Sequence, residues 1–211
     1  MAESREIIDL RKLLAERFRH PPAHAGGQIS TPLLDRATDG GLRKGAITEI
    51  ISPNMSAGSA LLIHSLLQIA QRDRFFLALI DGRDSFDVQS VDATTLQHLL
   101  WVRCEKATEA IKTADFLLRD GNFPLVVLDL VLNPVEELRR IPATSWYRLQ
   151  RLVEPAPTAF VVMSRHNMVA SAGTKIVLEN GWTLPDLSGD NPGAQVHFKV
   201  RRAKTIASAL G

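Results

Sequence analysis

Short apolar segments alternate with helical segments through the middle of the chain, and this alternation limits the fold more than any other feature. The expected strands are residues 46–52, 75–81, 99–104, 124–132 and 158–164. The expected helices between them are residues 59–71, 107–120 and 144–154, the last capped by Thr144 or Ser145. Strands that are apolar throughout and joined by helices predict an α/β fold with a mainly parallel central sheet and helices on both faces.

The C-terminal part breaks this alternation. Residues 174–184 and 194–204 read as strands, and the segment between them, "DLSGDNPG", is rich in turn-forming residues. With no helix between the two strands, the sequence predicts a C-terminal antiparallel hairpin.

The N-terminal segment predicts an amphipathic helix that is set apart from the core. In residues 3–18 the apolar side chains recur at helical spacing: Ile7, Leu10, Leu14 and Phe18. The stretch that follows carries two prolines and two glycines and reads as a linker. We therefore divide the chain into a helix with its linker, residues 1–28, and a core domain, residues 29–211. The helix is expected either to pack on its own core or to dock on a neighbouring subunit or partner.

Charge and cysteine content exclude several classes of protein. The net charge of +2 creates no strong field that would draw the molecule to nucleic acid. No apolar run approaches the roughly 20 residues of a membrane span, and the N-terminus has no signal-peptide core. A single cysteine, Cys104, rules out an internal disulfide, and the histidines have no metal-ligand spacing. We expect a cytoplasmic protein with no metal site.

Clusters of mostly polar residues lie at or near the carboxyl ends of four of the expected strands. They are Ser52, Pro53, Ser56, Ala57, Gly58 and Ser59 after the first strand, Asp81, Arg83 and Asp84 after the second, Asp129 in the fourth, and Ser164 and Arg165 after the fifth. Ligands of open parallel sheets bind beyond the carboxyl ends of the strands. We therefore expect these clusters to converge on one rim of the sheet.

Several segments, in this order, resemble the core of the RecA recombinase. They are "ISTPLLDRATDGGLRKGAITEI" (29–50), "LIDGRDSFD" (79–87), "LVVLD" (125–129) and "FKVRRAK" (198–204). The chain has no room for the large C-terminal domain of RecA. Its length, together with "LLWVRC", "RIPATSWYRLQRLVE" and "PTAFVVMSR", is more similar to the short RecA-like ImuA family of bacterial mutagenesis cassettes. The resemblance implies a RecA-like P-loop NTPase fold.

The segment in the place of the P-loop, "SPNMSAGS" (52–59), has lost most of what phosphate binding needs. A P-loop requires glycines that open its backbone to phosphate, a lysine and a hydroxyl that holds Mg²⁺. In one register Gly58 stands at the lysine and Ser59 at the hydroxyl; in the other, Ser59 stands at the lysine and Ala60 at the hydroxyl. The lysine is absent in both registers, so Lys44 or Arg83 would have to supply the missing charge.

The catalytic position departs from RecA as well. The resemblance aligns RecA's catalytic glutamate with Arg83, and a guanidinium cannot accept a proton. Asp84 could take the role only through a one-residue shift. Asp129 occupies the Walker B position and could be a structural anchor. We therefore expect a pseudo-ATPase with no catalytic residue and no cofactor, in which ATP with Mg²⁺ is a weaker possibility.

Basic residues suggest contacts with partners. Arg202 and Lys204 match a basic pair that in RecA reaches a neighbouring subunit's nucleotide, and either of them could instead contact DNA phosphate or only solvent. Arg165 and Lys175 flank a short loop that lies where RecA has its second DNA-binding loop. The loop lacks stacking aromatics, so direct DNA binding is expected to be weak.

The resemblance implies an accessory protein of SOS mutagenesis and translesion synthesis. Its expected partners are RecA, polymerase-like components, or its own copies through the N-terminal helix. The alternatives are a weak DNA-dependent ATPase and a single-stranded DNA-binding relative of RecA.

Overall fold

A computed structural model of the 211-residue chain describes residues 27–38, 40–54, 58–180 and 198–202. The predicted N-terminal helix and most of its linker lie outside these residues, as does the loop of the C-terminal hairpin. The predicted division of the chain at residue 28 therefore stays a prediction.

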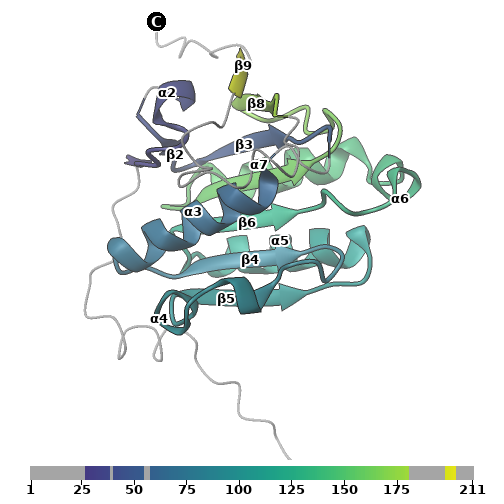
Figure 1. The fold of residues 1–211 in the computed structure, drawn as a ribbon. Helices are drawn as coiled ribbons and strands as arrows, with labels where there is room; N and C mark the ends of the chain where they lie inside the picture. The colour runs from purple at the N-terminus through teal and green to yellow at the C-terminus, as the bar shows by residue number, and fades with distance from the viewer. Residues whose placement is uncertain (1–26, 39, 55–57, 181–197, 203–211) are drawn as a thin grey trace, which may run out of the picture.

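The centre of the molecule is a seven-stranded sheet with the strand order β5-β4-β6-β7-β3-β8-β9 (Figure 1). The strands are β3 (Ala46–Ile51), β4 (Leu77–Asp81), β5 (Leu99–Arg103), β6 (Leu125–Asp129), β7 (Ala159–Ser164), β8 (Thr174–Leu178) and β9 (Phe198–Arg202). Neighbouring strands are parallel except for β8 and β9, which are antiparallel. The predicted mainly parallel sheet with a C-terminal antiparallel hairpin is confirmed.

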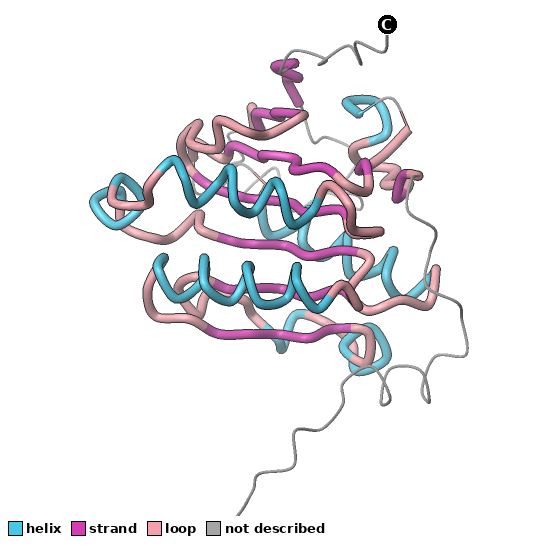
Figure 2. Tube along the Cα trace, turned by 180° about the vertical axis from the view of Figure 1, so that it is seen from behind, coloured by secondary structure: helices cyan, strands magenta, loops and turns pink. Residues whose placement is uncertain are grey.

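Helices cover both faces of this sheet. One face carries α3 (Ser59–Arg72) and the short α4 (Ala93–Leu96), which follows the 3-10 turn η1 (Val88–Ser90). The opposite face carries α5 (Ala107–Asp120) and α7 (Ala143–Val153), which lie side by side in Figure 2. The five-residue α6 (Val135–Arg139) lies between β6 and α7 in the chain.

The sheet separates two hydrophobic cores. Alternate residues of each strand enter different cores, since successive strand side chains point to opposite faces. In β6, for example, Val127 packs in the α3 core and Val126 in the α5–α7 core, and both are fully buried. Because both faces are covered, the strands can be apolar throughout, as the sequence indicated.

The structure corrects two boundaries. The strand predicted to run to residue 132 ends at Asp129, because the Asp129 carboxylate turns back to accept the Val131 N–H at 2.9 Å. Helix α7 begins at Ala143 after Pro142, with no side-chain cap. The prediction that Thr144 or Ser145 caps the helix is therefore wrong: both residues lie in the first turn, and the Ser145 N–H bonds the carbonyl of Pro142.

Three short elements before β3 were not predicted individually. β1 (Gln28–Ile29) pairs antiparallel with β2 (Leu42–Arg43), and α2 (Asp35–Thr38) lies between them. Asp35 closes this segment by accepting the Thr31 N–H at 2.7 Å. Ile29, Leu34 and Leu42 add their side chains to the α3 core.

Candidate functional site

The polar clusters do converge on one rim, because β4, β6, β7 and β3 are adjacent and parallel. Asp81 is in register with Asp129, and Ile51 is in register with Ser164. The Ser52 N–H continues the pairing beyond β3 by donating to the Ser164 carbonyl at 2.8 Å. The carboxyl ends of four strands therefore share this edge, as the sequence predicted.

The turn after β3 leads directly into α3. Ser52 is fully buried, and its hydroxyl donates to the Asn54 carbonyl at 3.2 Å, whereas Pro53 is exposed. Ser56 and Ala57 lie outside the described residues. Gly58 is the N-cap of α3 with φ of 100°, and no side chain caps the helix. The first turn of α3, which begins at Ser59, carries no acidic residue, so its free N–H groups keep the partial positive charge of a helix N-terminus.

Asp81 is a structural residue that holds the loop after β4. Its side chain is 1% exposed and accepts hydrogen bonds from the backbone N–H groups of Arg83 (3.3 Å), Ser85 (2.7 Å) and Phe86 (2.7 Å). The Ser85 hydroxyl and the Trp101 indole N–H donate to it as well. A carboxylate with this many donors has little capacity left for a substrate proton or a metal ion.

The Arg83 side chain points toward the loop between β5 and α5. Its Nη1 donates to the Glu105 carbonyl at 2.8 Å and lies 4.0 Å from Glu137 Oε1. Asp84, with φ of 53°, is exposed, and its Oδ1 lies 3.8 Å from Arg103 Nε. Both side chains therefore face the α5–β5 region and not the turn after β3.

Neither cation proposed as a substitute for the P-loop lysine lies near the turn. Arg83 follows β4, which is separated from β3 by β6 and β7, three strand spacings of about 4.8 Å each. Lys44 precedes β3 and therefore lies at the amino end of the sheet, opposite the rim; partial burial lowers the pKa of its ammonium. The positions of these two residues in the fold therefore give no support to the possibility that one of them supplies the missing charge.

The carboxyl group of Asp129 has a raised pKa. Burial and, to a lesser extent, the neighbouring charge of Asp81 raise the pKa of Asp129 to about 6, against the lowering effect of the Val131 N–H. The carboxylate is therefore ionised at neutral pH at a cost to the folded state. The Asp129 carboxylate also accepts the Val131 N–H where β6 ends, which is an interaction within the fold.

A close backbone contact between two rim loops was missed by the sequence reasoning. The Gly82 N–H donates to the Asp129 carbonyl at 2.8 Å, and Asn133 Nδ2 donates to the Gly82 carbonyl at 2.8 Å. A Cβ atom at Gly82 would lie 2.3 Å from Asn133 Oδ1 and 2.7 Å from the Asp129 carbonyl. Only glycine fits here, and the glycine directly after the strand's final aspartate was the available signal.

Glu49 is a second residue that the sequence reasoning missed. It is fully buried in the middle of β3, with Oε2 2.8 Å from Lys175 Nζ. Its Oε1 accepts the N–H groups of Met168 (2.6 Å) and Val169 (2.9 Å). Glu49 thus fixes the connection between β7 and β8 onto the sheet. A charged residue inside the apolar run "AITEII" was the signal that pointed to it.

The basic residues that the sequence predicts as contacts with partners lie in different surroundings. Lys175 is only 14% exposed and is neutralised by Glu49, so it is not a free contact for nucleic acid. Arg165 follows β7 and is half-buried, and its buried Nε has no hydrogen-bond partner among the residues that the structure describes. Arg202 ends β9 opposite Thr174, and its side chain is not described. Lys204 lies outside the described residues.

The described part of the chain offers neither a metal site nor a membrane span. No group of three or more His, Cys, Asp or Glu residues there could hold a metal ion. No helix there is long and apolar enough to cross a membrane.

Comparison with known proteins finds similarity to RecA proteins. The chain is 31% identical to RecA of Chloroherpeton thalassium over 156 residues, which are 71% of this chain and 43% of that protein. It is 30% identical to RecA of Desulfotalea psychrophila over 136 residues, 62% of this chain and 38% of that protein. A third match, RecA homolog 1 of Arabidopsis thaliana chloroplasts, named a DNA repair protein, is 30% identical over 109 residues, 50% of this chain and 25% of that protein.

The chain thus spans less than half the length of these relatives. No protein-family model matches the sequence. A RecA-like fold fits the mostly parallel sheet and the terminal hairpin. The chain therefore has a RecA-like core.

Proposed function

We propose that this protein is a RecA-like accessory factor of the ImuA type, which acts in DNA repair through protein contacts and does not hydrolyse ATP. One observation carries the proposal: Arg83, at the position aligned with RecA's catalytic glutamate, is bonded to the Glu105 carbonyl and cannot accept a proton. Asp84 does not replace it, because its carboxylate is exposed and pairs with Arg103.

The turn after β3 supports the loss of nucleotide chemistry. A φ of 100° is readily adopted by glycine, so Gly58 best corresponds to the second P-loop glycine. In that register Ser59 replaces the lysine and Ala60 replaces the Mg²⁺-binding hydroxyl. A charge-assisted hydrogen bond contributes about 1.5–3 kcal/mol, and a triphosphate would lose more than one.

The remaining rim carboxylates are consistent with this degenerate site. The hydrogen-bonding capacity of Asp81 is used by the loop 82–86 and by Trp101. Asp129 ends its strand by bonding the Val131 N–H. Both residues can therefore persist because the fold needs them, without a metal ion or a nucleotide.

The proposed role in DNA repair rests on the RecA relatives. The proposed action through protein contacts rests on the surroundings of the basic residues, which disfavour direct DNA binding. Lys175 is held by Glu49, and the connection 165–173 carries no Phe, Tyr or Trp side chain on which a base could stack. Direct DNA binding would then be weak. RecA itself and the polymerase-like proteins of translesion synthesis are the partners that we propose, in an SOS-type response in the cytoplasm.

A steady-state ATPase assay tests the proposal, with and without single-stranded DNA. We expect no turnover above background, and no difference between the wild type and Asp129→Ala. The double variant Ser59→Lys/Ala60→Thr, which restores the two missing groups, serves as a comparison for nucleotide binding. Turnover well above background that Asp129→Ala abolishes would overturn the proposal and support a weak DNA-dependent ATPase.

Binding experiments separate the remaining alternatives. Immobilised protein should retain purified RecA or polymerase-like components at a salt concentration where it no longer retains single-stranded DNA. If DNA is instead bound tightly, with an affinity that falls steeply as salt rises, the protein is a single-stranded DNA binder.

A further inference from the structure

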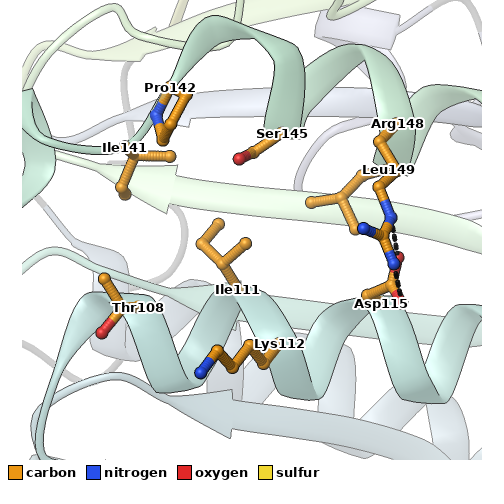
Figure 3. Close-up of a pocket in the computed structure, with 9 residues that line it drawn as sticks. All are labelled: Thr108, Ile111, Lys112, Asp115, Ile141, Pro142, Ser145, Arg148 and Leu149. Atoms are coloured by element: carbon orange, nitrogen blue, oxygen red, sulfur yellow. Dashed lines mark hydrogen bonds and ion pairs between the residues drawn. The ribbon is translucent and has the colours of Figure 1, made fainter.

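Helices α5 and α7 enclose an open hollow on the face of the sheet opposite α3. Its volume is about 300 Å³, and it is lined by residues of α5 from Thr108 to Asp115, by residues of α7 from Ser145 to Leu149, and by the two residues before α7. Figure 3 shows Ile111 of α5 pointing into this hollow from one side and Ser145 and Leu149 of α7 from the other. We call this hollow the α5–α7 groove.

The groove combines an apolar floor with a basic edge. Ile111, Ile141 and Leu149 form the floor. Lys112 lies at the edge, exposed, and within the described residues it has no ion-pair partner. The other edge cation, Arg148, is already bound by Asp115, with contacts of 2.7 and 3.0 Å.

The size of the groove fits about two apolar side chains. A closed cavity of about 150 Å³ holds a benzene ring, so a hollow of twice that volume accepts two branched aliphatic groups one helical turn apart. The free Lys112 adds a preference for a carboxylate next to these groups. The expected occupant is therefore an amphipathic segment with an apolar stripe and an acidic residue beside it.

We propose that residues 3–18 of the same chain occupy the α5–α7 groove. At helical spacing, Leu10 and Leu14 are consecutive members of the apolar stripe of this segment. Glu3 precedes Ile7 by four residues and so shares its side of the predicted helix, where it can pair with Lys112. The segment thus offers both the apolar groups and the charge that the groove lacks.

The chain is long enough for this docking within one molecule. Gly27 is anchored near the C-terminal end of α7, because its carbonyl accepts the Lys44 N–H and the adjacent Gly45 lies close to Glu154, whose carbonyl would be 3.0 Å from a Cβ atom at Gly45. The groove begins roughly 8–14 Å farther along α7, at 1.5 Å per residue. The eight residues 19–26 include Pro21 and Pro22 and span about 25 Å when extended.

Docking of this kind would keep the apolar stripe of residues 3–18 covered in the free protein. A partner that binds the segment would have to displace it from the groove. The inference does not depend on the loss of ATP chemistry, so it stands or falls separately from the proposed function.

Hydrogen exchange read by mass spectrometry on the full-length chain tests the proposal. We expect the amides of residues 3–18 to exchange about tenfold or more slowly than in an unstructured peptide. Ser145→Trp, which fills the groove, should abolish this protection. Arg151→Trp, an equally bulky change on an exposed part of α7 outside the groove, should leave it intact.

A pair of charge reversals provides a second test, which does not depend on whether the Ser145→Trp variant folds correctly. Lys112→Glu changes an exposed residue and should reduce the protection, and the combination Lys112→Glu/Glu3→Lys should recover it. The protection must also be the same at low and high protein concentration, because docking within one chain does not depend on dilution. Absence of protection, insensitivity to Ser145→Trp, or protection that is lost on dilution would each overturn the proposal, the last in favour of docking on a second copy.

Discussion

Replacing Asp129 by asparagine should stabilise the protein at neutral pH, although Asp129 lies on the rim where a RecA-like enzyme would hold its nucleotide. In the folded state the pKa of Asp129 is raised to about 6 from an ordinary value of 3.8. A group with a raised folded-state pKa stabilises the fold at low pH, and this contribution is lost as the pH rises through about 6. Asparagine keeps the acceptor for the Val131 N–H and never carries the charge.

The size of the effect follows from the two pKa values. At about 1.4 kcal/mol per pKa unit, the ionised carboxylate costs the fold about 3 kcal/mol at pH 7.5 and about 1 kcal/mol at pH 4.5. Any cost of burying the amide is independent of pH and cancels between the two conditions. The stability of Asp129→Asn relative to the wild type should therefore be about 2 kcal/mol greater at pH 7.5 than at pH 4.5.

Urea denaturation at the two pH values measures this difference, and thermal melts should show a relative gain of about 4–8 °C. Asp84→Asn is the matched control, because Asp84 is an exposed rim carboxylate whose backbone conformation asparagine tolerates. Its change should vary by less than about 0.5 kcal/mol between the two conditions. An equal effect of Asp129→Asn at both pH values, or a loss of stability confined to neutral pH, would refute the reasoning, because it would show that the pKa of Asp129 is not raised in the folded state.

Two further substitutions test contacts that hold the rim. Glu49→Gln leaves Lys175 without its counter-charge and should destabilise the fold by about 3 kcal/mol in urea denaturation, whereas Glu179→Gln, in an exposed pair with Lys199, should change it by less than about 0.5 kcal/mol. An equal effect of the two would mean that the buried pair has no special role. Gly82→Ala should cost about 3 kcal/mol, because its Cβ would meet Asn133 Oδ1 and the Asp129 carbonyl. Gly173→Ala, whose Cβ would have 3.8 Å to its nearest neighbour, should be tolerated, and a similar tolerance at Gly82 would contradict the described contact.

The sheet and its main helices could be predicted because they rest on periodicity. Strands that are apolar on both faces and helices of eleven to fourteen residues leave a clear pattern. The elements that were missed are too short to show one: α2 and α4 have four residues each, and α4 is defined by Asp92, which accepts the N–H groups of Thr94 and Thr95. Its signal is local hydrogen bonding and not hydrophobic spacing.

The position of the candidate site in the fold could be predicted from the sequence, but the direction of its side chains could not. Residues at the carboxyl ends of parallel strands must share one edge, so the convergence of Asp81, Asp129 and Ser164 followed from the topology. The direction of Arg83 did not, because it depends on the Glu105 carbonyl, which the fold brings close from another loop. The pairing of Glu49 with Lys175 depends in the same way on the register of β3 with β8.

Calorimetric titration with Mg²⁺–ATP and a non-hydrolysable analogue tests the central claim most directly. The protein concentration should be high enough to detect millimolar dissociation constants. The degenerate turn between Ser52 and Ser59, with no lysine and no substitute cation from Lys44 or Arg83, predicts no measurable heat of binding. Micromolar binding that is lost in Asp129→Ala would contradict the account and show that this rim is a working nucleotide site.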